Sequence, residues 1–214
     1  GCGSIVLTRA LGDIDPMAAT VAVALAFASV LTVFVTATMY ISGAHFNPAV
    51  SVAFALIGRL KPIDLAVYVV LQLLAACCAV GMIVLCLSGH PVLAAAIDAA
   101  NHGASLGILS VGQDASPMAV LGLEALMTFA LMFVILWGVA DRHAHKLGGL
   151  CVGLVVAACV LSFGPITGAS LNPARSLGPA IYGYWDMHWV YWLGPTAGAC
   201  AAALVYRLAF EERE

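Results

Sequence analysis

The sequence predicts an all-α membrane protein, built as an inverted repeat with two re-entrant half-helices. Three observations carry this prediction: an apolar composition, five stretches long enough to span a bilayer, and one motif that occurs twice. Of the 214 residues, 63% are hydrophobic and 9% are charged, whereas soluble domains carry about 25% charged residues. So few charges cannot cover a water-facing surface, and eight Lys and Arg spread along the chain exclude a nucleic-acid-binding role.

The spans follow from length, because a spanning helix needs about 20 mostly apolar residues. Five stretches qualify: Met17–Ile41, Leu65–Leu87, Pro117–Ala140, Leu147–Phe163 and His188–Phe210. The residues before Pro16 resemble the last turns of a further span followed by a loop.

Positive charge predicts the orientation, because Lys and Arg are enriched in cytoplasmic loops. With Arg175 left aside, six of the other seven fall on one side if the spans alternate: Arg59, Lys61, Arg142, Lys146, Arg207 and Arg213. The other side holds Arg9 and the loop Ser88–Ser116, which has no Lys or Arg. We therefore expect a cytoplasmic C-terminus. The alternation holds only if the segments from Ser42 to about Ile57 and from about Gly164 to Tyr182 enter the membrane and return.

The motif that occurs twice reads "SGAHFNPAVS" at Ser42–Ser51 and "TGASLNPARS" at Thr167–Ser176. A second match joins "YVVLQLLAA" from Tyr68 to "YWLGPTAGA" from Tyr191. The chain is therefore predicted to be a single membrane domain of two related halves, residues 1–116 and 117–214. Inverted repeats place their functional site near the midplane, where broken helices meet.

Each copy is predicted to begin a half-helix inside the membrane. Pro is favoured in the first turn of a helix, and Asn before it is a good N-cap. The residues ahead of the Asn are expected to be extended, and non-helical backbone at that depth survives only where it lines water or is buried in protein. Carbonyl groups are thus expected to line a narrow lumen, those of Gly43, Ala44, His45, Gly168, Ala169 and Ser170. The positive ends of the two half-helices would repel cations there.

With the motifs Asn47-Pro48-Ala49 and Asn172-Pro173-Ala174, the sequence resembles the aquaporin, or major intrinsic protein, family over essentially its whole length. The resemblance implies an hourglass pore of six spans and two half-helices, and four monomers associated in the lipid bilayer. It implies that Asn47 and Asn172 donate hydrogen bonds to water at the centre of the pore. It also implies a second constriction nearer the outer mouth, formed by Phe27, Val160, Ala169 and Arg175.

Two ionisable residues stand out. Arg175 lies three residues after Asn172, so both can face one lumen, where the Arg would donate to permeating oxygens and repel cations. A charge near mid-membrane costs about 2.5–3.5 kcal/mol; the alternative is that Arg175 reaches the outer interface. Family members use a Glu at the position of Glu124 to accept hydrogen bonds from the second re-entrant segment. This predicts a structural brace, with a proton relay as the alternative.

The residues that indicate which solute passes do not all agree. Water-selective members typically carry a His where this chain has Val160, which predicts a wider, less polar constriction. Glycerol-type members usually carry an Asp where this chain has Ser176, and Ala180 and the pair Tyr191-Trp192 match the water type. We predict a passive channel for water, with some passage of small uncharged solutes, that excludes protons and ions. A glycerol facilitator is the first alternative and an ion-coupled transporter the second; no spacing points to an enzyme, a metal or a cofactor.

Further expectations concern single positions. The ring of His45 should pack against loops, and His143 and His145 should lie in a solvated loop rather than form a pH gate. The pairs Gly149/Gly153 and Gly194/Gly198 should permit close helix packing. By repeat position, a Glu bracing the first re-entrant segment would precede Gly1, so the sequence is expected to be a fragment or truncated. A plasma membrane, with a bacterial inner membrane as one candidate, is the expected location.

Overall fold

The computed structural model describes residues 2–10, 14–91, 115–140, 147–182, 185 and 187–210, and the statements below refer to these. Five helices are long and apolar enough to cross a membrane: α2 (Pro16–Ser42), α4 (Pro62–Cys86), α6 (Pro117–Ile135, continued by a π-helical turn Leu136–Ala140), α7 (Gly148–Thr167) and α9 (Val190–Phe210). Three helices are shorter: α1 (Cys2–Ala10), α3 (Pro48–Leu56) and α8 (Pro173–Ala180). The predicted all-α class with five spans is confirmed.

One predicted boundary is wrong. The fourth span does not stop at Phe163, because α7 continues to Thr167 with Pro165 in its last turn. A helix commonly ends where a residue adopts the left-handed conformation, and here that residue is Gly168, with φ 81° and its N–H bonded to the carbonyl of Gly164 at 2.8 Å. The second re-entrant segment therefore starts at Gly168. In the first copy α2 ends in the same way at Gly43, with φ 72°.

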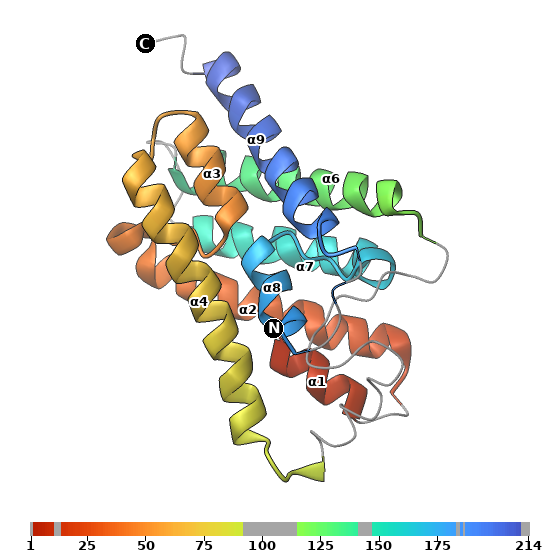
Figure 1. Cartoon of the computed structure of the whole chain (residues 1–214). Coiled ribbons are helices and arrows are strands. Elements are labelled where there is room, and N and C mark those ends of the chain that lie inside the picture. Colours follow the sequence, from red (N-terminus) through yellow and green to blue (C-terminus); the bar gives the residue numbers. More distant parts are fainter. Residues whose placement is uncertain are drawn as a thin grey trace.

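Close packing between helices holds the fold together (Figure 1). The two most extensive helix pairs are α6 with α9 and α2 with α7. Gly149 and Gly153 lie against Thr36 and Thr32 of α2, while Gly194 and Gly198 lie against Glu124 and Ala125 of α6. A methyl group on any of these four glycines would overlap the facing helix, which confirms the predicted role of both pairs.

This packing makes Gly198→Ala a test of the α6–α9 contact. The new methyl group would fall on the carbonyl oxygen of Ala125, and overpacking of this kind costs about 1–3 kcal/mol. We expect a lower melting temperature for the detergent-solubilised protein. Size-exclusion chromatography after heating measures it. Gly122→Ala on α6 is the matched control, because nothing lies within 4 Å of its added carbon. Equal melting temperatures for the two variants would contradict the packing argument.

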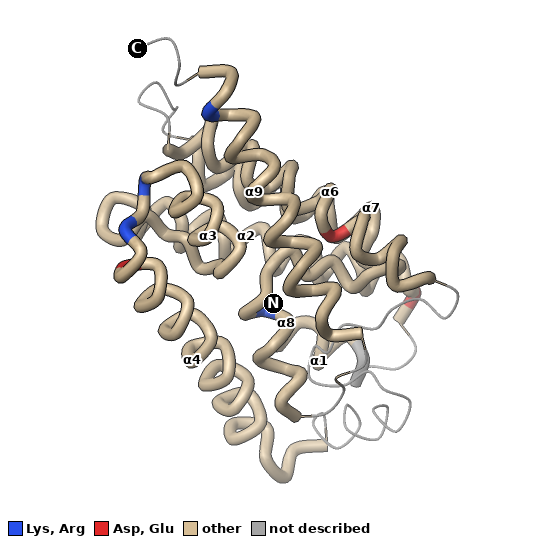
Figure 2. The backbone as a smooth tube through the Cα atoms, turned by 45° about the horizontal axis from the view of Figure 1, so that its top comes forward, with Lys and Arg blue, Asp and Glu red and all other residues tan. Residues whose placement is uncertain are grey.

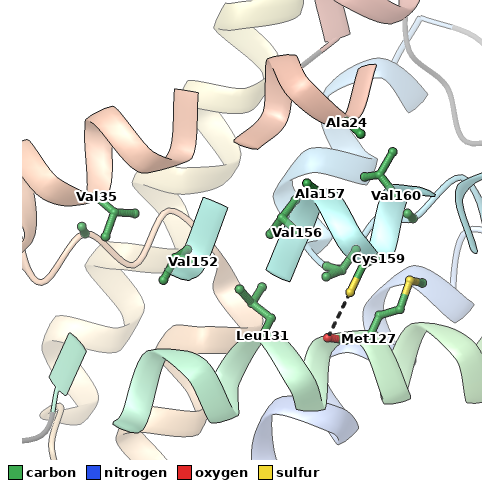
Figure 3. Close-up of a cluster of buried hydrophobic side chains, with 12 residues drawn as sticks. Ala24, Val35, Met127, Leu131, Val152, Val156, Ala157, Cys159 and Val160 are labelled. Atoms are coloured by element: carbon green, nitrogen blue, oxygen red, sulfur yellow. Dashed lines mark hydrogen bonds between the residues drawn. The ribbon is translucent and has the colours of Figure 1, made fainter. Parts of the chain in front are cut away.

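A buried apolar cluster fills the space between α2, α6 and α7 (Figure 3). Ala24 and Val35 of α2, Leu131 of α6 and Val156 of α7 belong to it. The cluster extends to Ala44 and Ala169, one residue from each re-entrant segment. The core therefore supports the irregular backbone from the side of these three helices.

Charged residues of the described part lie mostly at helix ends, with exceptions on α6 and α8 (Figure 2). Arg59, just after α3, donates to the hydroxyl of Tyr206 at 3.2 Å and stacks over its ring at 4.8 Å. The turn between α3 and α4 therefore lies beside the C-terminal part of α9, so two of the predicted clusters of positive charge share one end. Several residues on which the orientation and the pH-gate predictions depend lie outside the described residues: Arg142, His143, His145, Lys146, Arg213 and most of the loop Ser88–Ser116.

Candidate functional site

The N-termini of α3 and α8 meet near the centre of the molecule, and each is capped by an asparagine. Asn47 Oδ1 accepts from the backbone N–H of Ala49 at 2.9 Å. Asn172 Oδ1 accepts from Ala174 at 2.9 Å and from Arg175 at 3.3 Å. Pro48 and Pro173 hold the first helical positions, where a missing N–H costs nothing.

The same two asparagines join the copies. Asn47 Nδ2 donates to the carbonyl oxygen of Leu171, and Asn172 Nδ2 donates to that of Phe46, both at 2.8 Å. Each amide nitrogen carries two hydrogens, so one of them remains after this bond is made. Nothing in the motif alone indicates the exchange, which depends on the relative placement of the two half-helices.

The backbone ahead of each Asn is not simply extended, so this part of the prediction is wrong. Three residues in each copy have positive φ: Gly43 (72°), Ala44 (48°) and Phe46 (48°) match Gly168 (81°), Ala169 (44°) and Leu171 (54°). Non-glycine residues adopt this conformation rarely and at a cost. Its recurrence at equivalent positions shows that the conformation belongs to the motif. At Gly43 a side chain would also meet the ring of His45, 3.2 Å from the added carbon.

The two half-helices run in opposite directions. The end of α3 leads into the start of α4. In α8, Gly178 packs against Ala76 and Val80, well along α4, and Tyr182 lies beside Gly81. The re-entrant segments therefore enter from opposite ends of the molecule, and the predicted inverted repeat is confirmed.

A tyrosine explains the second match between the halves. The hydroxyl of Tyr68 on α4 donates to the carbonyl of Ser42, at the end of α2, at 2.6 Å. The hydroxyl of Tyr191 on α9 donates to the carbonyl of Thr167, at the end of α7, at 2.7 Å. In both halves the tyrosine thus fixes the residue from which the re-entrant segment departs.

A cavity of about 190 Å³ lies where the half-helices meet. Polar groups converge on it from Asn47, Asn172, Ser170 and Arg175, while α2, α6 and α7 contribute an apolar wall. Gly43, Ala44, His45 and Ala169 also line it. Gly168 lies instead on a second cavity of about 440 Å³ between α1, α2 and α7.

The four predicted constriction residues gather where these two cavities adjoin. Arg175 lines both cavities, and its guanidinium lies 5.6 Å from the centroid of the Phe27 ring. Phe27 and Ala169 border the central cavity, whereas Val160 borders the second one. Arg175 is therefore common to the walls of both spaces.

Glu124 on α6 is fully buried and accepts two hydrogen bonds from the second re-entrant segment and one from Thr167, the last residue of α7. Its Oε1 accepts from the Thr167 hydroxyl at 2.8 Å and from the Ser170 N–H at 2.9 Å, and its Oε2 accepts from the Leu171 N–H at 2.8 Å. Thr167, which the sequence reasoning missed as a site residue, also accepts from the Ala169 N–H at 3.0 Å. The carboxylate thus ties the strained backbone to α6.

A third cavity of about 700 Å³ opens between α1, α4 and α8 and shares Phe27, His45, Asn172 and Arg175 with the central one. In the second half, α6 packs on α7 and α9. At the equivalent place in the first half, the described part of the chain has α1, which packs on α2 and whose Val6 clusters with Val80 of α4. In the same part of the chain, no three His, Cys, Asp or Glu side chains are arranged to hold a metal ion.

The fold and the site define a multi-pass membrane channel in which two oppositely directed half-helices enclose the passage. The family model described as major intrinsic protein matches residues 1–206. Aquaporin TIP4-4 of Zea mays is 42% identical over 96% of this chain and 79% of its own length, and nodulin-26 of Glycine max is 38% identical over 97% and 71%. The chain belongs to the major intrinsic protein family, whose members are channels for water and small neutral solutes.

A solved structure agrees with this fold. The X-ray structure of the aquaglyceroporin from Plasmodium falciparum superposes with a TM-score of 0.82, at 22% sequence identity, over 97% of this chain and 89% of that one. At this identity the likeness concerns the fold alone.

Proposed function

We propose that the protein is a passive water channel that also passes small uncharged solutes, excludes protons and ions, and catalyses no reaction. The observation that carries the proposal is the pair of asparagines at the central cavity. Each has committed one amide hydrogen to the opposite copy and keeps one. Two N–H donors from opposite sides can hold the oxygen of one water molecule, which turns its own hydrogens away from the centre.

Two electrostatic features support the exclusion of cations. The N-termini of α3 and α8 both face the centre, and each carries a partial positive charge. Arg175 adds a full charge where the central and second cavities adjoin. We propose that the outer constriction is formed by Phe27, Val160, Ala169 and Arg175. We also propose that the carbonyl groups of residues 43–45 and 168–170 accept hydrogen bonds from the permeating water molecules.

We propose that Glu124 is a structural brace rather than a proton relay. Its two oxygens already accept three hydrogen bonds from Thr167, Ser170 and Leu171. A proton relay or an ion-coupled transporter would need a second ionisable group to act with Glu124. Arg175 is the one other candidate that the sequence offers within the membrane.

Osmotic swelling of proteoliposomes tests the proposed function. We expect fast water flux, a slower flux of glycerol or urea, and no dissipation of a proton gradient. Glycerol flux far above water flux would favour the glycerol facilitator, for which Val160 is the supporting residue. Flux that saturates with solute or needs an ion gradient would favour a transporter.

Val160→His tests the origin of the solute passage. Val160 is 5% exposed and borders the second cavity with Arg175. An imidazole fills more space there than the Val side chain, and a steric change of about one methylene in a tight pocket changes discrimination by roughly 1–3 kcal/mol. We therefore expect urea and glycerol flux to fall several-fold while water flux stays within about twofold. Val205→His, on the exposed face of α9, is the control. Unchanged solute flux in Val160→His would remove this residue from the constriction.

Assembly and location belong to the same proposal. We propose that halves 1–116 and 117–214 form one channel domain, that four copies associate in the bilayer of a plasma membrane, and that the C-terminus is cytoplasmic. The shared end of the α3–α4 turn and α9 supports the orientation. The apolar exposed faces of α4, including Leu71, Leu74 and Leu85, support lipid or helix contact there. Crosslinking in native membranes would test the tetramer.

A further inference from the structure

A polar chain links α4 to the first half-helix, and no equivalent chain is found among the described residues of the second half. Gln72 Nε2 donates to Ser51 Oγ at 3.0 Å, and Ser51 Oγ lies 3.0 Å from His45 Nδ1. The Ser51 hydroxyl also lies 3.2 Å from the carbonyl oxygen of Asn47. In the aligned second half, Pro195 stands at the position of Gln72 and cannot donate a side-chain hydrogen bond.

The bonding capacity of Ser51 fixes the roles in this chain. Its one hydroxyl hydrogen can go only to His45 Nδ1 or to the Asn47 carbonyl, both of which lie within reach. In this arrangement Gln72 Nε2 is the donor to the Ser51 oxygen, at 3.0 Å. Gln72 Oε1 is buried and receives no hydrogen bond from the described residues. Ser51 is thus the single polar anchor of the Gln72 amide.

The ring of His45 does not pack against loops, as the sequence reasoning expected, but against two helices. It stacks on Phe54 of α3 with centroids 4.7 Å apart and contacts Tyr68 of α4 at 5.0 Å. The same residue borders both the central cavity and the cavity of about 700 Å³ beside it. His45 is therefore part of the wall between the two spaces.

We propose that Gln72, acting through Ser51, is a positioning residue that holds His45 in this wall and so keeps the first half of the pore narrow. Without the anchor, the His45 ring keeps its contacts with Phe54 and Tyr68 but loses the hydrogen bond that fixes its orientation, so it can turn. That movement widens the passage beside Asn47, and a wider passage admits solutes larger than water. The inference rests on the proposed channel function.

The experiment compares Gln72→Met and Ser51→Ala with the wild type in proteoliposomes of the full chain. Met keeps the shape of the side chain and removes both polar groups; Ala removes the shared hydroxyl and keeps the helix. We expect the urea-to-water permeability ratio to rise about 2- to 10-fold in either variant, the range set by the loss of one hydrogen bond. The double variant should show no further rise, because both changes cut the same chain.

Matched controls separate positioning from general loosening. Thr38→Val on α2 removes a hydroxyl that bonds only to Phe34 in its own helix and should leave the ratio at the wild-type value. Ser176→Ala is the equivalent change in the second copy, where the hydroxyl donates to Pro173 within α8, and should act less than Ser51→Ala. If Gln72→Met does not insert, Ser51→Ala alone decides the test.

Each outcome is informative. A wild type without water flux would overturn the proposed channel function itself. A conducting wild type together with an unchanged ratio in Gln72→Met or Ser51→Ala would overturn only the positioning role. A ratio in the double variant equal to the product of the single effects would show that Gln72 and Ser51 act independently, which also contradicts the proposal.

Discussion

Glu124→Gln is expected to destabilise the protein strongly and to abolish water flux. The carboxylate accepts from Thr167, Ser170 and Leu171, and an amide has one acceptor oxygen and turns its NH₂ toward the remaining donor. Each buried donor left without an acceptor costs about 1–3 kcal/mol. The second re-entrant segment, with its three residues of positive φ, would then lose its tie to α6.

Thermal unfolding in detergent and stopped-flow swelling measure the two effects of Glu124→Gln. Asp64→Asn, the same exchange of carboxyl for amide at an exposed position of α4, is the control. Thr167→Val removes one of the three bonds to Glu124 together with the bond from the Ala169 N–H; it should also lower the melting temperature, which keeps the test usable if Glu124→Gln does not insert. A Glu124→Gln protein with wild-type melting temperature and water flux would rule out the brace.

Arg175→Val is expected to let cations and protons through while water flux changes little. A unit charge about 5 Å from a permeating cation raises its energy by about 3 kcal/mol at an effective dielectric constant of 20, on the order of a hundredfold in occupancy. The substitution by Val leaves the two asparagines and their exchange of hydrogen bonds in place. The groups that bind water at the centre of the pore are therefore unchanged.

A pH-sensitive dye inside proteoliposomes reports proton entry in Arg175→Val, and light scattering reports water flux on the same vesicles. Arg207→Val, at the end of α9, removes a charge outside the cavities and should match the wild type. If Arg175→Val stays as tight to protons as the wild type, the half-helix ends alone provide the barrier.

The sequence was sufficient for the features that depend on local chemistry or on composition. Apolar length predicted the five spans to within a few residues except at Thr167, and Asn-Pro predicted both capped half-helix starts. The glycine pairs predicted close helix packing but not its partners, which the structure gives as α2–α7 and α6–α9; only a hydrogen at Gly198 lets α9 approach Ala125 so closely.

Other features depend on placement in three dimensions and left no local pattern. The positive φ angles on either side of His45 and Ser170 recur in both copies of the motif, but Ala, Phe and Leu do not favour positive φ by themselves, so residue type alone could not predict them. The bond from Gln72 to Ser51 joins positions 21 residues apart on two helices. The roles of Tyr68 and Tyr191 were visible only as an unexplained similarity between the halves.

The exchange of hydrogen bonds between the copies that contain Asn47 and Asn172 makes the two halves of the molecule depend on each other. Residue 47 of one copy bonds residue 171 of the other, and residue 172 bonds residue 46. This reciprocal pattern is that of an isologous contact between two identical subunits, here made within one polypeptide. Each half-helix therefore needs the other copy to complete its hydrogen bonds, and a structural defect in one copy affects the other through a single hydrogen bond.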